Sequence, residues 1–120
     1  MTLTIRDETA NGSVTNELTL DVLTETITVR ELIRSRVYQE VNDYNLRKRQ
    51  DQAFRGLVTP RRQGHEIDWK EQFSKACEAF ERNGFFILIG DKQAESLDEE
   101  ITLHQNEPLS FVKLVPLVGG

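Results

Sequence analysis

The apolar residues of this chain change their repeat period at Thr28, and this change constrains the fold more than any other feature. Before it, residues 2–6 and 17–22 alternate apolar and polar side chains, which is typical of strands with one buried face. Asn11 and Gly12, between these stretches, tolerate positive φ and favour a hairpin turn. After it, apolar residues recur at helical spacing; they are Val29, Leu32, Ile33, Val37, Val41 and Tyr44. The pattern therefore predicts a β-hairpin that leads into an amphipathic helix.

Side-chain patterns locate the start of this helix. Thr28 and Glu31 have the spacing of a capping box, in which each side chain accepts a hydrogen bond from the other residue's backbone N–H. Ile27 and Leu32 have the spacing of the hydrophobic staple that often accompanies it. We therefore expect the helix to begin at the residue after Thr28 and to continue to about Phe54, before a loop.

A second helix is predicted by another capping box, Asp68 with Glu71, and by Asn83-Gly84, which is typical of a glycine cap at a helix end. The apolar face of this helix holds Trp69, Phe73, Ala76, Cys77 and Phe80. We expect its aromatic side chains to be mostly buried and to lie over an open edge or face of the sheet.

The last part of the chain carries the remaining strands. Residues 85–89 are a continuous apolar run, typical of a fully buried strand, and residues 97–103 hold a turn and a short strand. Residues 109–115 are apolar on both faces, which suits a strand at the centre of a sheet. The order of elements predicts an α+β fold over residues 1–120, in which a helix crosses a mixed sheet and a helical insertion occupies about 45–84.

Composition excludes several classes of protein. The chain has 120 residues, of which 38% are hydrophobic, and no apolar run approaches the roughly 20 residues of a membrane span. Its first residues lack the basic and apolar segments of a secretory signal. Cys77 is the only cysteine, so no intramolecular disulfide can form. We expect a cytoplasmic protein that does not contact a membrane.

The charge is unevenly distributed, because a basic block interrupts an acidic chain with a net charge of −5. The block consists of Arg47, Lys48, Arg49, Arg55, Arg61 and Arg62. Such a block is either a solvated loop or a contact surface for an acidic partner, including the acidic surface of another copy. Nucleic acid is not an expected partner, since the acidic remainder would repel phosphate and no aromatic residues interleave with the arginines.

The closing stretch "FVKLVPLVGG" ends in an apolar tail and two glycines. The tail consists of Val115, Pro116, Leu117, Val118, Gly119 and Gly120. Pro116 lacks the N–H needed to continue a strand ladder, and glycines let another backbone or an active site come close. We expect the tail to leave the sheet and to place its apolar side chains in a partner's groove.

Several stretches resemble the β-grasp proteins of the ubiquitin and sulfur-carrier superfamily. They are "LTLDVLTETITVRELI", "LIGDKQ", "SLDEEITL" and "LSFVKLVPLVGG". The resemblance covers roughly residues 1–44 and 85–120, and the glycines stand at its end. Residues 45–84 have no counterpart in the small members and look like the larger ubiquitin-like modifiers of prokaryotic conjugation systems.

The resemblance implies chemistry at Gly120. An adenylating enzyme would activate its carboxylate with ATP and magnesium, so the chain itself binds no cofactor. The acyl group would then pass to a conjugating enzyme and to a target lysine, from which a deconjugating peptidase removes it. Two alternatives remain: a sulfur carrier with a C-terminal thiocarboxylate, which the uncharged tail favours, and a β-grasp binding module that is never activated.

Other chemistry-bearing residues fit structural roles. Cys77 lies on an apolar helical face, which predicts a buried structural thiol. His65 and His104 have no Cys, His or carboxylate partners at ligand spacing, so we expect no metal site. The acids at 98–100 follow a turn and are expected to be solvated. The chain has no phosphate-binding loop and no nucleophile elbow. The resemblance implies that the protein is a substrate of other enzymes and not an enzyme, with no catalytic side chain of its own.

Overall fold

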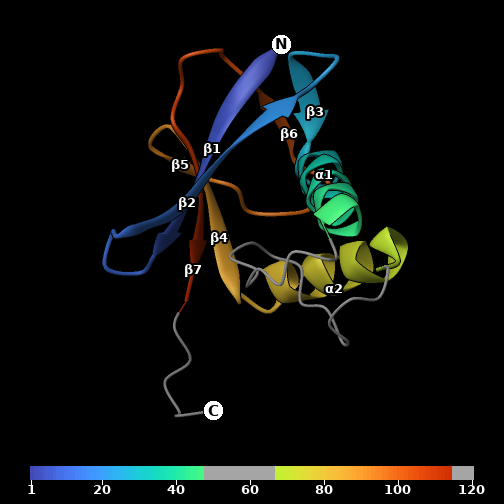
Figure 1. Cartoon of the computed structure of the whole chain (residues 1–120). Helices are drawn as coiled ribbons and strands as arrows, with labels where there is room; N and C mark the ends of the chain where they lie inside the picture. The colour runs from blue at the N-terminus through green and yellow to red at the C-terminus, as the bar shows by residue number, and fades with distance from the viewer. Residues whose placement is uncertain (48–66, 115–120) are drawn as a thin grey trace.

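The computed structural model describes residues 1–47 and 67–114 (Figure 1). The hairpin, the two helices and the later strands follow one another in the predicted order, and two short strands, residues 26–28 and 92–93, were not predicted. In chain order the elements are β1 (Thr2–Thr9), β2 (Val14–Asp21), β3 (Thr26–Thr28), α1 (Val29–Arg47), α2 (Trp69–Glu81), β4 (Phe85–Ile89), β5 (Lys92–Gln93), β6 (Glu100–Thr102) and β7 (Leu109–Lys113). The fold is α+β, as predicted. The predicted continuation of the first helix to Phe54 lies outside the described residues.

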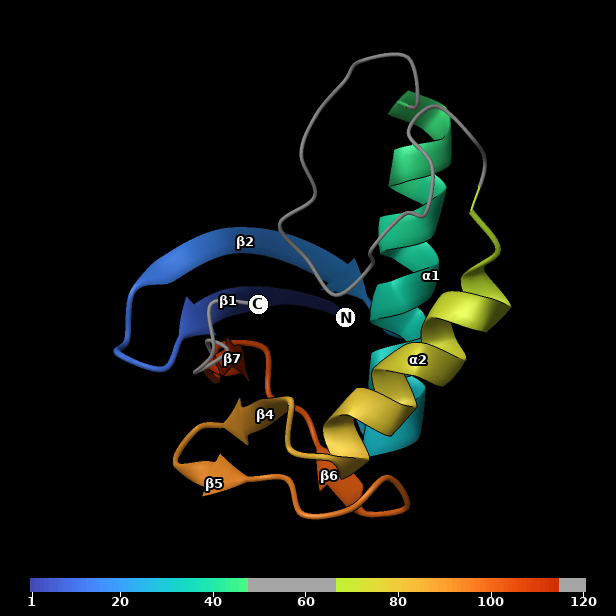
Figure 2. The same cartoon turned by 90° about the horizontal axis from the view of Figure 1, so that it is seen from below.

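The strands form a mixed five-stranded sheet and a separate two-stranded one. The five-stranded order is β2-β1-β7-β4-β5, and β3 pairs with β6. β7 runs parallel to β1 and antiparallel to β4, so the last strand lies between two others, as predicted. Figure 2 shows α1 and α2 together on one side of the strands. One face of the sheet is therefore covered by helices.

The start of α1 is held by backbone groups from a distant loop. Thr28 Oγ1 accepts a hydrogen bond of 3.1 Å from the Glu31 N–H, as the capping box predicts. The N–H groups of Val29 and Arg30 donate to the carbonyls of Glu99 and Leu97, each at 2.9 Å. The first N–H groups of the helix, which have no partner within a helix, are thus satisfied.

Asp98 and Glu100 of the acidic stretch 98–100 are exposed, as predicted, but the stretch also takes part in this contact. Asp98 pairs with Arg30 at 3.1 Å, and the Glu99 carboxylate accepts a hydrogen bond of 2.7 Å from the Glu95 N–H. The stretch therefore joins β6 to the start of α1.

The end of α2 differs in one detail from the predicted glycine cap. The left-handed residue is Asn83, with φ 61°, and not Gly84. The N–H of Asn83 donates to Phe80 O and that of Gly84 to Ala79 O, the two hydrogen bonds of a Schellman motif. A Cβ at Gly84 would lie 3.1 Å from Ala79 O, a tight contact that glycine avoids.

The core lies between the helix-covered face of the sheet and α1, and Phe111 of β7 is fully buried there. One burial prediction is wrong: β4 is not fully buried, because Phe86 and Leu88 are partly exposed. The predicted burial of the aromatic side chains of α2 is confirmed, since Phe80 is buried and Trp69 and Phe73 pack against the core with most of their surface covered. Their predicted place over the sheet is wrong, because α2 packs mainly on α1.

One side chain, that of Asn45, joins the two ends of the insertion between α1 and α2. Asn45, near the end of α1, accepts a hydrogen bond of 2.9 Å from the Ile67 N–H through Oδ1 and donates one of 3.2 Å to Ile67 O through Nδ2. This pair of bonds, the Asn45–Ile67 bridge, imitates a step of strand pairing. It fixes where the chain leaves one helix and approaches the next.

Candidate functional site

The last described residues show how the predicted tail is attached to the body. In the sheet register, Lys113 of β7 pairs with Thr9 of β1 on one side and with Phe85 of β4 on the other. The Leu114 N–H donates to Gly84 O at 3.3 Å. The tail itself, Val115, Pro116, Leu117, Val118, Gly119 and Gly120, lies outside the described residues. Its attachment point is therefore held from both sides.

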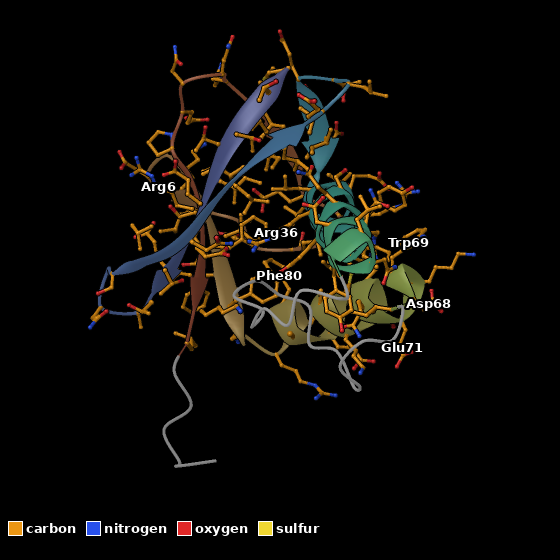
Figure 3. The ribbon with its side chains drawn as sticks, viewed as in Figure 1. Arg6, Arg36, Asp68, Trp69, Glu71 and Phe80 are labelled. Atoms are coloured by element: carbon orange, nitrogen blue, oxygen red, sulfur yellow. The ribbon has the colours of Figure 1, made fainter. Side chains whose placement is uncertain are left out.

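A buried ion pair lies under this end of β7. Arg36 of α1 contacts Asp7 of β1 through two bonds, Nη1 to Oδ1 at 2.5 Å and Nη2 to Oδ2 at 2.6 Å. Both side chains are at most 1% exposed. Asn16 Nδ2 adds a hydrogen bond of 3.2 Å to the same carboxylate. Figure 3 shows Arg36 between the strands and α1, so the pair joins helix and sheet.

Further charges surround this pair. Glu40 Oε2 lies 3.9 Å from Arg36 Nε, and the guanidinium carbon lies 4.5 Å from the centre of the Phe111 ring. Burial lowers the pKa of Lys113; Asp7 and Glu40 oppose this shift, and Arg36 adds to it. Asp7 and Arg36 are buried in this cluster, whereas Glu40 and Lys113 are partly exposed.

This pair was not predicted from the sequence, although its two residues stand at inward-facing positions of their elements. Asp7 follows Leu3 and Ile5 at strand alternation, which places it on the buried face of β1. Arg36 lies four residues after Leu32, on the buried face of α1. Two opposite charges at inward positions of neighbouring elements predict a buried pair.

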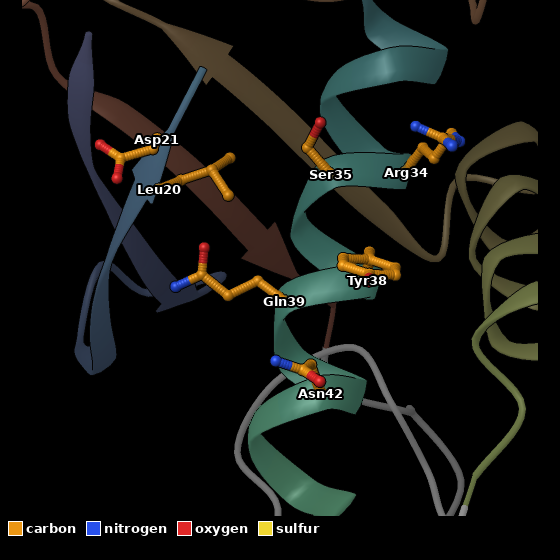
Figure 4. Close-up of a pocket in the computed structure, with 7 residues that line it drawn as sticks. All are labelled: Leu20, Asp21, Arg34, Ser35, Tyr38, Gln39 and Asn42. Carbon is orange, nitrogen blue, oxygen red and sulfur yellow. The ribbon is translucent and has the colours of Figure 1, made fainter. Parts of the chain in front are cut away.

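A groove lies between β2 and α1 (Figure 4). It has a volume of about 410 Å³ and is lined by Leu20, Asp21, Arg34, Ser35, Tyr38, Gln39 and Asn42. Two polar side chains already have structural partners: Gln39 Nε2 donates to Thr19 O at 2.8 Å, and Asp21 Oδ1 accepts from Thr2 at 2.5 Å. Asp21, the carboxylate among these lining residues, is therefore already engaged in a hydrogen bond between β1 and β2.

Aromatic side chains join the two helices next to this groove. Tyr38 lies edge-on to Trp69, with ring centres 5.5 Å apart. The Arg34 guanidinium lies over the same Trp69 ring, at 5.2 Å from its centre. Trp69 therefore serves mainly to fasten α2 to α1.

The other residues singled out in the sequence are Cys77, the two histidines and the basic block. Cys77 is buried in α2, as predicted, and burial raises the pKa of its thiol. His104 is exposed, and His65 lies outside the described residues. Within residues 1–47 and 67–114, no three His, Cys, Asp or Glu side chains are grouped to hold a metal ion. Arg47 is the last residue of α1; the rest of the basic block, Lys48, Arg49, Arg55, Arg61 and Arg62, lies outside the described residues.

Neither helix of the described part has both the length and the apolar character that crossing a membrane requires. Comparison of the chain with models of protein families, with curated proteins and with solved structures finds no match.

Proposed function

We propose that this chain is a ubiquitin-like protein modifier with a β-grasp fold, activated at Gly120 and conjugated to amines of target proteins. The observation that carries the proposal is the position of β7. This last strand is central in the sheet, parallel to β1, and its end is fastened to Gly84. Residues after Leu114 therefore start from a rigid body, as a tail that is presented to an enzyme must.

The order of the elements supports the same proposal. A β-hairpin leads into α1, which packs on one face of a mixed sheet, and this arrangement is compatible with a β-grasp fold. The covered face contains one hydrophobic core to which both helices and the sheet contribute, which supports a compact body that carries the tail. The proposal requires Gly120 to be the terminal residue of the mature chain, either as encoded or after proteolysis.

The proposed chemistry needs no side chain of this protein. The Gly120 carboxylate attacks the α-phosphorus of ATP, which forms an acyl-adenylate and releases pyrophosphate. A cysteine thiol of the activating or conjugating enzyme then displaces AMP, and a lysine amine displaces that thiol to form an amide. Six residues after Leu114 span at most about 20 Å, which reaches an active site below an enzyme surface.

The test detects the C-terminal residues of this chain on the lysines of modified proteins. A tagged chain is expressed in its own host, and proteins coupled to it are purified under denaturing conditions and digested with trypsin. Cleavage after Lys113 would leave Leu-Val-Pro-Leu-Val-Gly-Gly on each modified lysine, which mass spectrometry identifies. Variants that lack Gly120 or carry one added residue after it are the matched controls. Equal coupling by these controls would contradict activation at Gly120.

A second experiment distinguishes a protein modifier from a sulfur carrier by the product formed at Gly120. With the cognate adenylating enzyme, ATP and magnesium, the intact chain should release pyrophosphate and the two tail variants should not. A lysine amide as product supports the modifier, and a thiocarboxylate at Gly120 supports a sulfur carrier. No pyrophosphate from any variant would leave the binding module as the remaining alternative.

A further inference from the structure

The face of the sheet opposite the helices carries a row of apolar side chains with one carboxylate among them. Register places Val14 beside Glu8, Glu8 beside Val112, and Val112 beside Phe86, across β2, β1, β7 and β4. Val14 is 53% exposed, and the other three are partly exposed. The alternate residues Ile5, Asp7 and Phe111 are buried on the helix side, so this row faces away from it.

A second row lies next to the first. Leu88 of β4 pairs with Ser110 of β7, and Ser110 with Arg6 of β1. Arg6 in turn pairs with Glu17 of β2, through Nε and Oε2 at 3.5 Å. The charges of Arg6 and Glu17 therefore neutralise each other. Glu8, in contrast, has no cationic partner among residues 1–47 and 67–114.

The apolar members of these rows do not belong to the core. Phe86, Leu88, Val112 and Val14 are neither in the buried cluster nor among the partly buried residues packed against it. Both helices lie on the other side of the strands (Figure 2). An apolar sheet face with one unpaired carboxylate fits a partner segment in which a cation stands among apolar residues.

The sequence of this chain contains such a segment. Residues 53–58 read "AFRGLV", in which Arg55 follows Phe54 and precedes Leu57 and Val58. We propose that the outer face of the sheet binds residues 53–58 of a second copy of this chain. Arg55 pairs with Glu8, and the apolar residues on either side of it cover Val112, Phe86 and their neighbours.

A second copy fits better than the same copy. The chain leaves α1 and approaches α2 at the Asn45–Ile67 bridge, and both helices lie on the face opposite to Glu8. A segment that starts and ends on the helix side reaches the outer face of a neighbour without passing around its own sheet. The contact joins two different surfaces, so the association is head-to-tail, and its average mass rises with concentration.

A charge exchange between Glu8 and Arg55 tests this proposal. Sedimentation velocity over a concentration series, up to about 1 mM, measures association of the wild-type chain and of Glu8→Arg, Arg55→Glu and Glu95→Arg. The first two variants should associate about tenfold more weakly, because like charges then meet at the contact. Glu95 is exposed in the loop after β5, so Glu95→Arg controls for the change in net charge.

Mixing the two weakened variants supplies the decisive comparison. In an equimolar mixture, Arg at position 8 of one variant meets Glu at position 55 of the other, and Glu8 meets Arg55, so both contacts between unlike variants are matched. Because each chain finds matched partners at half the total concentration, the mixture should associate as strongly as the wild type does at half that concentration. Circular dichroism confirms that each variant is folded. A wild-type chain that stays monomeric throughout the series would overturn the proposal. So would a mixture that associates no better than its components, or a Glu95→Arg variant weakened as much as Glu8→Arg.

Discussion

Arg36 and Asp7 form a two-point ion pair in the interior, with bonds of 2.5 and 2.6 Å and with both side chains at most 1% exposed. Removing two charges from water is costly, and their attraction repays this only with good geometry and further hydrogen bonds. Asn16 supplies one such bond to Asp7. The pair therefore depends on both partners being present.

Replacing one partner should destabilise the protein strongly. Arg36→Met leaves the Asp7 carboxylate buried without its cation and should lower the free energy of unfolding by about 3–5 kcal/mol. Urea denaturation measures this change. The double variant Asp7→Leu with Arg36→Met should recover most of the loss, because no buried charge remains.

The exposed pair of Arg82 and Glu78 provides the control for this experiment. Its atoms are 3.9 Å apart and its side chains are 79% and 60% exposed. Arg82→Met should change the free energy of unfolding by less than about 1 kcal/mol. A similar small effect of Arg36→Met would contradict the assignment of the Asp7–Arg36 pair to the interior.

Phe111 tests the central position of β7. Its ring is fully buried and stacks on Phe85, with ring centres 5.8 Å apart. Phe111→Ala should lower the free energy of unfolding by about 3–5 kcal/mol, because it leaves a cavity in the core. Val112→Ala, one residue on but facing outward, should cost much less in the monomer. Equal costs in thermal and urea unfolding would mean that β7 is not buried on one face as described.

Lys113 should give the stability a specific dependence on pH. Burial lowers its pKa below the ordinary 10.5, so the unfolded chain binds this proton more tightly than the folded one. At neutral pH the charged Lys113 therefore lowers the free energy of unfolding. This loss of stability disappears as pH rises from the pKa of Lys113 in the folded chain to 10.5, because the lysine is then neutral in both states. The measurement compares unfolding of the wild type and of Lys113→Met between pH 7 and pH 10.5.

The stability advantage of Lys113→Met should shrink as pH rises through that window. Lys92→Met, at an exposed position of β5, provides the control for the loss of one positive charge. An advantage of Lys113→Met that grows with pH would show that the sign of the pKa shift is wrong.

Cys77 should react slowly in the folded protein. Its thiol is buried, and burial raises its pKa; Glu81 adds to this shift and Arg30 opposes it. Because the thiolate is the reactive form, alkylation by iodoacetamide should be at least about tenfold slower in the native chain than in urea. Mass spectrometry follows the reaction. Equal rates would mean that α2 does not cover the thiol.

Local patterns in the sequence predict much of this fold. Alternation predicts β1 and β2, and the caps at Thr28 and Asp68 predict the starts of both helices, because each pattern reports contacts within a few residues. The apolar character of residues 109–113 also predicts the central place of β7. Each of these conclusions uses information that lies inside one element.

What the sequence did not predict depends on contacts between distant elements. The partners of the Val29 and Arg30 N–H groups are carbonyls almost 70 residues away, and no local pattern identifies them. The helical pattern predicts that Trp69 is mostly buried, but it does not predict that its ring lies against Tyr38 and Arg34 of the other helix. The Asn83-Gly84 pattern predicts the end of α2, but not that Asn83 takes the left-handed conformation while Gly84 lies close to Ala79.

The Asn45–Ile67 bridge has a consequence for how this protein can change in evolution. Because the bridge closes the chain at one point, we expect that residues between its ends can be added or lost without altering the register of the sheet or the packing of α1 on α2. Closing a chain twice as long costs only about 0.6 kcal/mol more. The Asn45 side chain thus marks the boundary between the helices and sheet, whose lengths are fixed by packing, and the insertion, in which we expect new sequence to be tolerated.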